Sequence, residues 1–207
     1  MAQRILGACA TAFFALPYLR RAHGLDRLRR EVKCLFVSNH VSLLDTVLLG
    51  SLFWRRHCYP ILVLGDKTVW HGSRFRRVLS GQIGFLLERS KLNLDRISEL
   101  ETFGRSINDF HLVVFPEGTR GDGVNVGRCQ PGIYYIAQQA RAPIVPVFIA
   151  NMQRVSTKHG RFHPLSGLRQ IEVYFGEPIK PQEYVPLTRD EFTEFVQAKI
   201  AAQRPTP

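Results

Sequence analysis

Six short runs of apolar residues, separated by segments with a helical pattern, constrain the fold of this chain more than any other feature. The apolar runs cover residues 34–37, 59–64, 83–87, 112–115, 144–149 and 171–175. The helical patterns cover residues 43–53, 73–79, 94–107, 132–139 and 189–202. Strands that are apolar along their whole length are buried on both faces, as in parallel sheets. The alternation therefore predicts an α/β fold with a mostly parallel central sheet flanked by helices.

The domain organisation follows from the length and from a change of pattern near residue 31. A chain of 207 residues suits one hydrophobic core with a short appendage. We expect residues 31–207 to form the α/β domain, and residues 1–30 to form an N-terminal helical segment that associates with a membrane.

The N-terminal segment contains an uncharged stretch, residues 5–19, interrupted only by Pro17 and followed by Arg20 and Arg21. A helix of about 15 residues rises about 22 Å, which is less than the roughly 30 Å hydrocarbon core of a bilayer. We therefore expect a helical hairpin whose second helix opens at Pro17 and whose apolar side chains enter one leaflet. Two alternatives stay open: a helix pair packed on the protein core, and a cleaved signal peptide, which the two arginines disfavour.

The net charge of +11 is concentrated in two stretches, residues 1–30 and residues 54–77. Each stretch contains six cationic residues and one aspartate, so together they contribute +10. Such patches suit an anionic membrane surface, an acidic carrier protein or a nucleic acid. The sequence has no helix-turn-helix, glycine-aromatic or zinc signature, so we expect no nucleic acid partner.

The four cysteines are far apart and form no C-x-x-C pair, so neither a disulfide framework nor a zinc knuckle is encoded. His159 and His163 have the spacing of half a zinc site, but no further ligand pair accompanies them. We therefore predict no metal site.

The loop after the first strand combines a histidine with a carboxylate five residues later, His40 and Asp45. If Ser42 caps the following helix, the Asp45 carboxylate can turn back toward the His40 ring, orient it and stabilise its charged form. The alternative is that Ser42 and Asp45 form only a capping box and that His40 is an ordinary loop residue.

The loop after the fourth strand has the sequence P-E-G-T-R at residues 116–120. Glycine and arginine in a loop fixed by proline can hold a phosphate oxygen, because the guanidinium is planar and always charged. The alternative is a glycine-rich turn with an exposed salt bridge. The glycine spacing matches neither a Walker loop nor a dinucleotide-binding fingerprint.

Five segments together resemble the ordered motifs of the membrane-associated glycerolipid acyltransferases, of the 1-acylglycerol-3-phosphate acyltransferase kind. They are N-H-V-S-L-L-D at residues 39–45, G-F-L-L-E-R at 84–89, F-P-E-G-T-R at 115–120, A-P-I-V-P-V at 142–147 and F-G-E-P-I at 175–179. Lys67 also stands where the family tends to have a lysine. Two departures concern the acceptor. Gln130 stands where the family commonly has a lysine, so one cation near the acceptor phosphate is either missing or replaced by Arg128, and residues 121–123 extend the third motif.

The resemblance implies an O-acyltransferase that moves a fatty acyl chain from acyl-CoA or acyl carrier protein to a lysophospholipid, lysophosphatidic acid being favoured. His40 would act as the general base, and Asp45 would fix its tautomer. The substrate-binding residues would be Asn39, Arg89, Glu117, Gly118, Thr119 and Arg120. Arg89 and Arg120 would bind the acceptor phosphate, while Glu117 would orient Arg120 or a glycerol hydroxyl. Gly118 would allow close backbone approach, and Asn39 would hold its loop or polarise the thioester carbonyl.

The same resemblance implies partners and a location. We expect no cofactor beyond the donor substrate, binding to an anionic leaflet, and a place on the cytoplasmic face of the inner or plasma membrane. Two alternative functions stay open: an acyltransferase for another lyso-lipid, such as a lyso-aminolipid, and a catalytically silent lipid-binding protein. The sequence does not define the oligomeric state.

Overall fold

The computed structural model describes residues 9–28, 32–58, 60–66, 84–87, 94–105 and 110–205, and these residues contain one seven-stranded sheet. In chain order the strands are β1 (Leu19–His23), β2 (Leu35–Ser38), β3 (Ile61–Asp66), β4 (Gly84–Leu87), β5 (His111–Val114), β6 (Ile144–Ala150) and β7 (Ile171–Phe175). Across the sheet the order is β1-β7-β6-β2-β5-β3-β4. Every pairing is parallel except that of β6 with β7.

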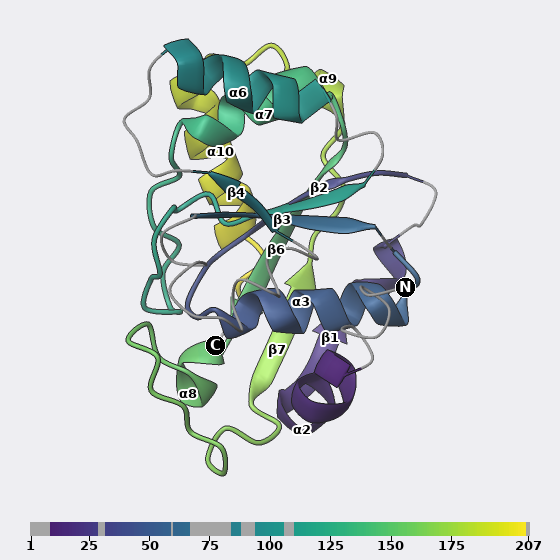
Figure 1. Cartoon of the computed structure of the whole chain (residues 1–207), viewed down its shortest axis with the longest axis vertical. Helices are drawn as coiled ribbons and strands as arrows, with labels where there is room; N and C mark the ends of the chain where they lie inside the picture. The colour runs from purple at the N-terminus through teal and green to yellow at the C-terminus, as the bar shows by residue number, and fades with distance from the viewer. Residues whose placement is uncertain are drawn as a thin grey trace.

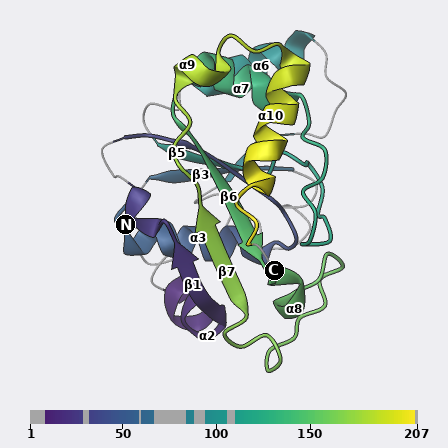
Figure 2. The same ribbon diagram turned by 180° about the vertical axis from the view of Figure 1, so that it is seen from behind.

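Helices cover both faces of this sheet. The α-helices are α2 (Leu16–Tyr18), α3 (Leu44–Arg55), α6 (Leu94–Arg105), α7 (Gly132–Ala140), α8 (Met152–Val155), α9 (Pro181–Tyr184) and α10 (Arg189–Ala201). A π-helical segment, Thr11–Ala15, leads directly into α2, and a 3₁₀ turn spans Leu25–Arg27. Figure 1 shows α3 on one face of the sheet and α6, α7 and α10 on the other. Figure 2 shows β1, β7 and β6 side by side from behind. No helix in the described part of the chain combines the length and the apolar character needed to cross a bilayer.

Two hydrophobic cores form because successive side chains of each strand point to opposite faces. Phe36 packs with α3 on one face, whereas Leu35 and Val37 pack with α7 and α10 on the other. All three side chains are almost completely buried. Burying each one stabilises the fold by about 1.5–3 kcal/mol, which explains why β2 is apolar along its whole length.

The structure confirms the predicted mostly parallel α/β sheet flanked by helices. Each of the six predicted strands occurs within two residues of its expected limits, as do four of the five predicted helices. The helix predicted at residues 73–79 lies outside the described residues.

The predicted second helix of the N-terminal segment is wrong, because residues 19–23 form strand β1. Pro17 lies inside a short helical stretch that ends at Tyr18, and β1 then pairs in parallel with β7. Phe14, Tyr18 and Leu19 are buried in the core beside α3, so this part of the segment packs on the protein, but as a helical stretch followed by a strand and not as the helix pair of the first alternative. The strand forms because β7 would otherwise leave a row of unpaired backbone groups at the sheet edge.

The sheet brings several connections to one end of the molecule. The pairing of Ser38 with Val147 places the ends of β2 and β6 together. Since β7 is antiparallel to β6, the end of β6 lies beside the start of β7, and the start of β1 lies next to that. The loops after β2 and β5, the short helix α8, and the connections that enter β7 and β1 therefore share this end.

Candidate active site

His40 and Asp45 form a hydrogen-bonded pair at this end of the sheet. His40 lies two residues after β2, and Asp45 is the second residue of α3. The distance from His40 Nδ1 to Asp45 Oδ2 is 2.8 Å. The Asp45 side chain is fully buried, whereas 15% of the His40 side chain is exposed. The predicted pair is therefore present, with its carboxylate inside the protein and its ring at the surface.

The backbone around Asp45 fixes the carboxylate in an orientation that suits a negative charge. Its Oδ2 atom also accepts hydrogen bonds from the N–H groups of Val41, at 2.6 Å, and Ser42, at 2.9 Å. The first turn of α3 adds the positive end of the helix dipole. Helix α3 begins at Leu44, with Leu43 at the N-cap position, one residue after the predicted cap Ser42. The Ser42 hydroxyl nevertheless accepts a hydrogen bond from the Leu44 N–H at 3.3 Å.

The arrangement defines which nitrogen of His40 is available for chemistry. A carboxylate accepts hydrogen bonds and does not donate them, so Nδ1 carries the proton toward Asp45, and in the neutral ring Nε2 then has a lone pair. The ring of His40 stacks on that of Phe115, with centroids 4.2 Å apart and an angle of 23° between planes. Among the described residues, none donates a hydrogen bond to Nε2.

Glu117 joins the two predicted loops to each other. Its Oε1 atom accepts a hydrogen bond from the His40 N–H at 2.9 Å, and Oε2 accepts one from the Gly127 N–H at 3.0 Å. Burial raises the pKa of this carboxyl, and the two backbone hydrogen bonds oppose that effect. The suggested contact of Glu117 with Arg120 is absent among the described residues. Glu117 instead positions the backbone on which His40 stands.

Two glycines make room for the Glu117 carboxylate. A Cβ atom at residue 127 would lie 2.6 Å from Glu117 Oε2, and one at residue 121 would lie 3.0 Å from it. Gly121 also donates its N–H to the carbonyl of His40 at 2.7 Å. Gly118 has a φ of 67°, so glycine is favoured there by the turn itself.

Asn39 holds the first loop against β6. Its Nδ2 atom donates to the carbonyl of Ile149 at 3.0 Å, and its Oδ1 atom accepts from the N–H of Ile149 at 2.7 Å. The side chain is buried. Of the two roles predicted for Asn39, the structure therefore contains the loop contact.

The predicted phosphate-binding residues lie exposed at the tip of the second loop. Gly118, Thr119 and Arg120 are exposed, and the Arg120 guanidinium makes no hydrogen bond or ion pair with another described residue. Arg120 directly precedes Gly121, whose N–H binds the His40 carbonyl, so its backbone lies beside the first loop. Gln130 lies close to Gly118. Arg89 lies outside the described residues.

Three parts of the site could not be expected from the motifs. The apolar run that contains Phe115 predicts only a strand residue, although its ring supports His40. Asp122 accepts hydrogen bonds from the N–H groups of Val124 and Asn125, which lower the pKa of its carboxyl. The sequence D-G-V-N at residues 122–125 is a turn signal, and it could have identified this turn held by Asp122. The hydroxyl of Ser42 donates to that of Ser156 at 2.9 Å, and no local pattern indicates that pairing.

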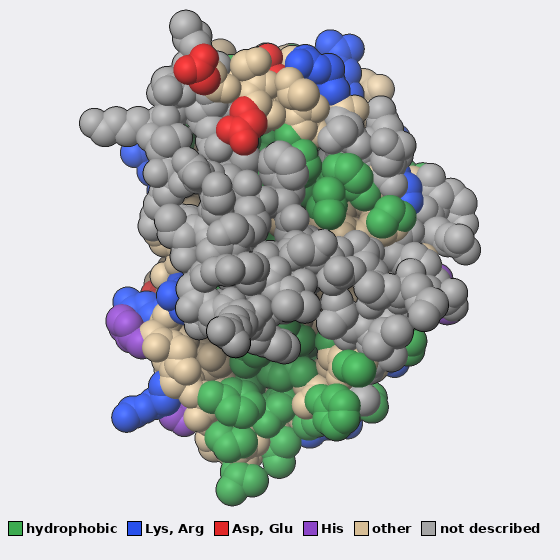
Figure 3. Space-filling model, in the orientation of Figure 1, with side chains coloured by type: hydrophobic (Ala, Val, Ile, Leu, Met, Phe, Trp, Pro, Cys, Tyr) green, Lys and Arg blue, Asp and Glu red, His purple; other side chains and the backbone are tan. Residues whose placement is uncertain are grey.

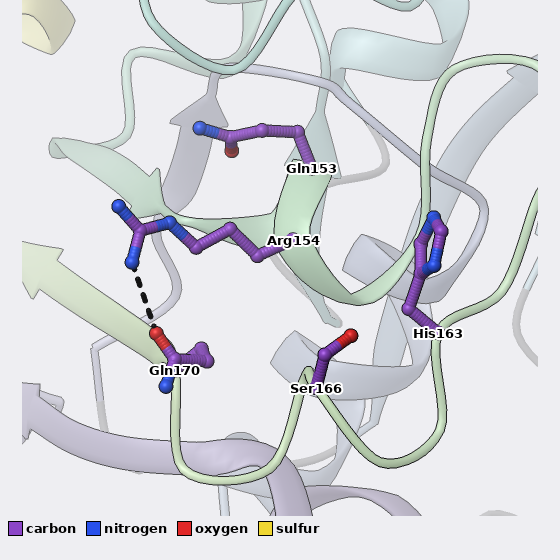
Figure 4. A pocket seen from close by; sticks show the side chains of 5 residues that line it. All are labelled: Gln153, Arg154, His163, Ser166 and Gln170. Carbon is purple, nitrogen blue, oxygen red and sulfur yellow. Dashed lines mark hydrogen bonds between the residues drawn. The ribbon is translucent and has the colours of Figure 1, made fainter.

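A separate hollow beside α8 contains none of the predicted site residues. It has a volume of about 510 Å³ and is lined by Gln153, Arg154, His163, Ser166 and Gln170. Figure 4 shows Arg154 reaching toward Gln170, to which it donates a hydrogen bond at 3.1 Å. Within the described ranges, no group of three or more His, Cys, Asp or Glu side chains is placed to hold a metal ion.

The fold and the His40–Asp45 pair define a class of α/β proteins with a hydrogen-bonded histidine and carboxylate at the carboxyl ends of parallel strands. Comparison with known families agrees with this class. The chain belongs to the acyltransferase family, whose model matches residues 20–150. The family predicted from the five motifs is thereby confirmed.

Named relatives make the family assignment more specific. The 1-acyl-sn-glycerol-3-phosphate acyltransferase of Saccharomyces cerevisiae is 31% identical over 171 residues, which cover 79% of this chain and 52% of the relative. The alpha form of that enzyme from Ovis aries is 33% identical over 161 residues, or 74% of this chain and 53% of the relative. The chain thus spans about half the length of these curated relatives.

A solved structure supports the fold. The crystal structure of the 1-acyl-sn-glycerophosphate acyltransferase PlsC from Thermotoga maritima matches with a TM-score of 0.70 over 97% of this chain and 77% of the other. The two sequences are 18% identical, so this likeness establishes the shared fold alone.

Proposed function

We propose that this protein is an O-acyltransferase that moves a fatty acyl chain from an acyl thioester to the free hydroxyl of a lysophospholipid. The observation that carries the proposal is the 2.8 Å contact between His40 Nδ1 and Asp45 Oδ2, which leaves Nε2 as a base. The names of the relatives favour lysophosphatidic acid as the acceptor and phosphatidic acid as the product.

The proposed chemistry uses His40 first as a base and then as an acid. Nε2 takes the proton of the acceptor hydroxyl while the hydroxyl oxygen attacks the thioester carbonyl carbon. The tetrahedral intermediate then collapses, the carbon–sulfur bond breaks, and the thiolate takes the proton back from Nε2. Asp45 stabilises the imidazolium that forms between these steps. General base catalysis of this kind contributes about 10² to 10⁴ in rate.

The second loop supplies the proposed acceptor site. Arg120 has an exposed guanidinium with no described protein partner, and its backbone lies beside the His40 loop. It would bind the phosphate of the acceptor together with Arg89. Gln130 stands beside Gly118 where a further cation is common in the family, and the exposed Arg128 would supply that cation if one is needed.

We further propose that the donor is acyl-CoA or acyl carrier protein and that no cofactor takes part. The donor would meet the basic stretch at residues 54–77, which could also extend the membrane-facing surface. The uncharged residues 5–19 and the neighbouring arginines would attach the protein to the cytoplasmic, anionic leaflet of the inner or plasma membrane.

One assay panel tests the proposed function. Purified protein in mixed micelles is offered each donor with lysophosphatidic acid, glycerol 3-phosphate, lysophosphatidylcholine or a lyso-aminolipid, and the products are identified by mass spectrometry. We expect phosphatidic acid from lysophosphatidic acid, and its loss in His40→Ala. His23→Ala on β1 is the matched control and should keep activity, because His23 stacks on Tyr174 at the far edge of the sheet.

The panel also separates the alternatives. If product formed only from another lyso-lipid, the proposed acceptor would be wrong and the proposed acyl transfer would stand. Lipid binding without product from any donor and acceptor would indicate a silent binding protein. If His40→Ala kept more than a few per cent of wild-type turnover, the proposed base would be wrong.

A further inference from the structure

Five large apolar side chains lie exposed at one end of the molecule. The exposed fractions are 80% for Phe13, 56% for Leu16, 47% for Phe162, 83% for Leu165 and 44% for Leu168. We call these five residues the apolar end surface. Two belong to the helical stretch before β1, and three belong to the connection between α8 and β7, residues 156–170. Figure 3 shows hydrophobic side chains gathered at the lower end of the molecule, where Figure 1 places α2 and this connection.

The two contributing segments are far apart in the sequence but are joined in the structure. The rings of Tyr18 and Phe162 meet edge to face, with centroids 5.6 Å apart and planes at 65°. The Arg169 N–H donates to the carbonyl of Pro17 at 3.0 Å. The apolar end surface is therefore one surface formed by two segments.

The connection holds its own shape while it exposes apolar side chains. The Thr157 N–H donates to the Arg161 carbonyl at 3.0 Å, and the His163 N–H donates to the Val155 carbonyl at 2.8 Å. The Gly167 N–H donates to the His163 carbonyl at 3.1 Å. These backbone hydrogen bonds lie within the connection and its junction with α8, and the Leu165 side chain points away from them into solvent. Large apolar groups exposed together in this way mark an interaction surface.

The charged side chains of residues 151–170 all have the same sign. Residues 151–170 include Arg154, Lys158, Arg161 and Arg169 and no acidic residue. All four cations are exposed. A second copy meeting this surface through a twofold axis would bring like charges together, whereas an anionic lipid surface complements them.

The apolar end surface lies at the same end of the sheet as His40. The connection begins beside the His40 loop, because the Ser156 hydroxyl accepts a hydrogen bond from that of Ser42 at 2.9 Å. Strand β1 lies three positions from β2 in the sheet. At about 4.8 Å for each step between strands, β1 and β2 are about 14 Å apart. This distance is slightly less than the hydrocarbon thickness of one leaflet, which is about 15 Å.

We propose that the apolar end surface and its cations seat the protein on an anionic bilayer, and that the connection 156–170 is a membrane contact in its own right. The inference rests on the proposed function, since a lipid acceptor must pass from the leaflet to Nε2 of His40. The apolar side chains enter the headgroup boundary, and the cations meet the lipid phosphates. This contact adds to that of the N-terminal segment.

Vesicle sedimentation of the full chain tests the proposal. Vesicles of phosphatidylcholine mixed with phosphatidylglycerol are compared with vesicles of phosphatidylcholine alone. We expect the double variant Leu165→Gln, Leu168→Gln to bind the mixed vesicles about tenfold more weakly than wild type, and Leu165→Phe to bind as wild type. The triple variant Lys158→Glu, Arg161→Glu, Arg169→Glu should lose the preference for the anionic vesicles.

The matched control is Val32→Gln, which removes an apolar side chain that is 43% exposed just before β2, at the opposite end of the sheet. It should bind vesicles as wild type. Binding by the double variant within twofold of wild type would overturn the proposal. The proposal would also be overturned if the double variant changed only self-association in sedimentation velocity, because the surface would then be an interface between copies.

Activity measurements keep this proposal separate from the proposed function. The double variant should transfer acyl chains to a short-chain acceptor, dissolved as monomers, at the wild-type rate. Its transfer rate to an acceptor in vesicles should fall by the same factor as its vesicle binding. Loss of transfer to the dissolved acceptor would show that the connection acts on the site, against the proposal. If no protein formed product but the tenfold loss of binding was seen, the proposed function would fail and the membrane contact would stand.

Discussion

A single methyl group at residue 127 should disturb both stability and activity, because it would occupy the space of the Glu117 carboxylate. In Gly127→Ala the new Cβ would lie 2.6 Å from Glu117 Oε2, so the carboxylate must move. Forcing an extra carbon into a packed site costs about 1–3 kcal/mol. A weakened hydrogen bond from a backbone N–H to a charged carboxylate costs about 1.5–3 kcal/mol. We expect the free energy of unfolding to fall by about 2.5–4 kcal/mol, the lower part of the summed range, because the hydrogen bond is weakened and not lost.

The same change should lower turnover, because Glu117 also accepts the N–H of His40. A shift of about 1 Å in a positioned catalytic group can cost about a hundredfold in rate. Urea unfolding measures the stability, and mass spectrometric detection of product measures turnover. Gly50→Ala is the matched control: a Cβ atom there meets nothing within 4 Å in helix α3. It should stabilise the protein by about 0.5–1 kcal/mol.

A double-mutant cycle isolates the contact. Glu117→Asp shortens the side chain and withdraws the carboxylate from residue 127. We expect the double variant Gly127→Ala, Glu117→Asp to be more stable than the sum of the single effects predicts, by at least about 0.5 kcal/mol. Additive effects, or a Gly127→Ala protein as stable and active as wild type, would refute the assigned role of Glu117.

Four further predictions address the site and the core. Asp45→Asn should fold but lose most turnover, since it keeps the shape and removes the anion that stabilises charged His40; full kcat would exclude that role. Arg120→Ala should raise the acceptor KM or lower turnover with unchanged vesicle binding, and unchanged kinetics would remove Arg120 from the acceptor site. Activity should survive exhaustive chelation, and loss restored by one divalent ion would contradict a metal-free mechanism. The pKa of His111 is lowered to about 4, mainly by burial and also by the charge of Lys33. As the pH falls, His111 therefore becomes protonated in the unfolded chain at a higher pH than in the folded protein. Stability should therefore drop by about 3 kcal/mol between pH 6.5 and pH 4, and His111→Phe should lack this component in denaturation at the two pH values.

The parts of the site that could be predicted from the sequence depend on neighbours along the chain. His40 and Asp45 are five residues apart, so one turn from strand to helix is enough to bring them together. The partners of Glu117 and Asn39 could not be predicted in this way. Glu117 contacts a backbone N–H that is 77 residues earlier, and Asn39 contacts β6 across 110 residues. Only the completed sheet brings those groups within hydrogen-bonding distance.

The difference between local and distant contacts also explains why strand β1 was predicted as a helix. The sequence L-R-R-A-H has neither the alternation of a half-buried strand nor the continuous apolar character of a buried one. Its conformation is determined by the edge of β7, because strand propensity depends strongly on tertiary neighbours. By contrast, β2, β5 and β6 are buried along their whole length, and their apolar runs are sufficient to predict them.

The pairing of β1 with β7 also has a consequence for how the protein is made. Leu19 pairs with Ile171, so the partner of the first strand emerges from the ribosome 152 residues later, the difference between 171 and 19. At about 5–20 residues per second, the first strand exists for roughly 8–30 s before that partner does. During this interval the apolar residues before β1 have no finished core to pack on. A bilayer or a chaperone near the ribosome therefore has the first opportunity to bind them, and β1 cannot pair until β7 has been made.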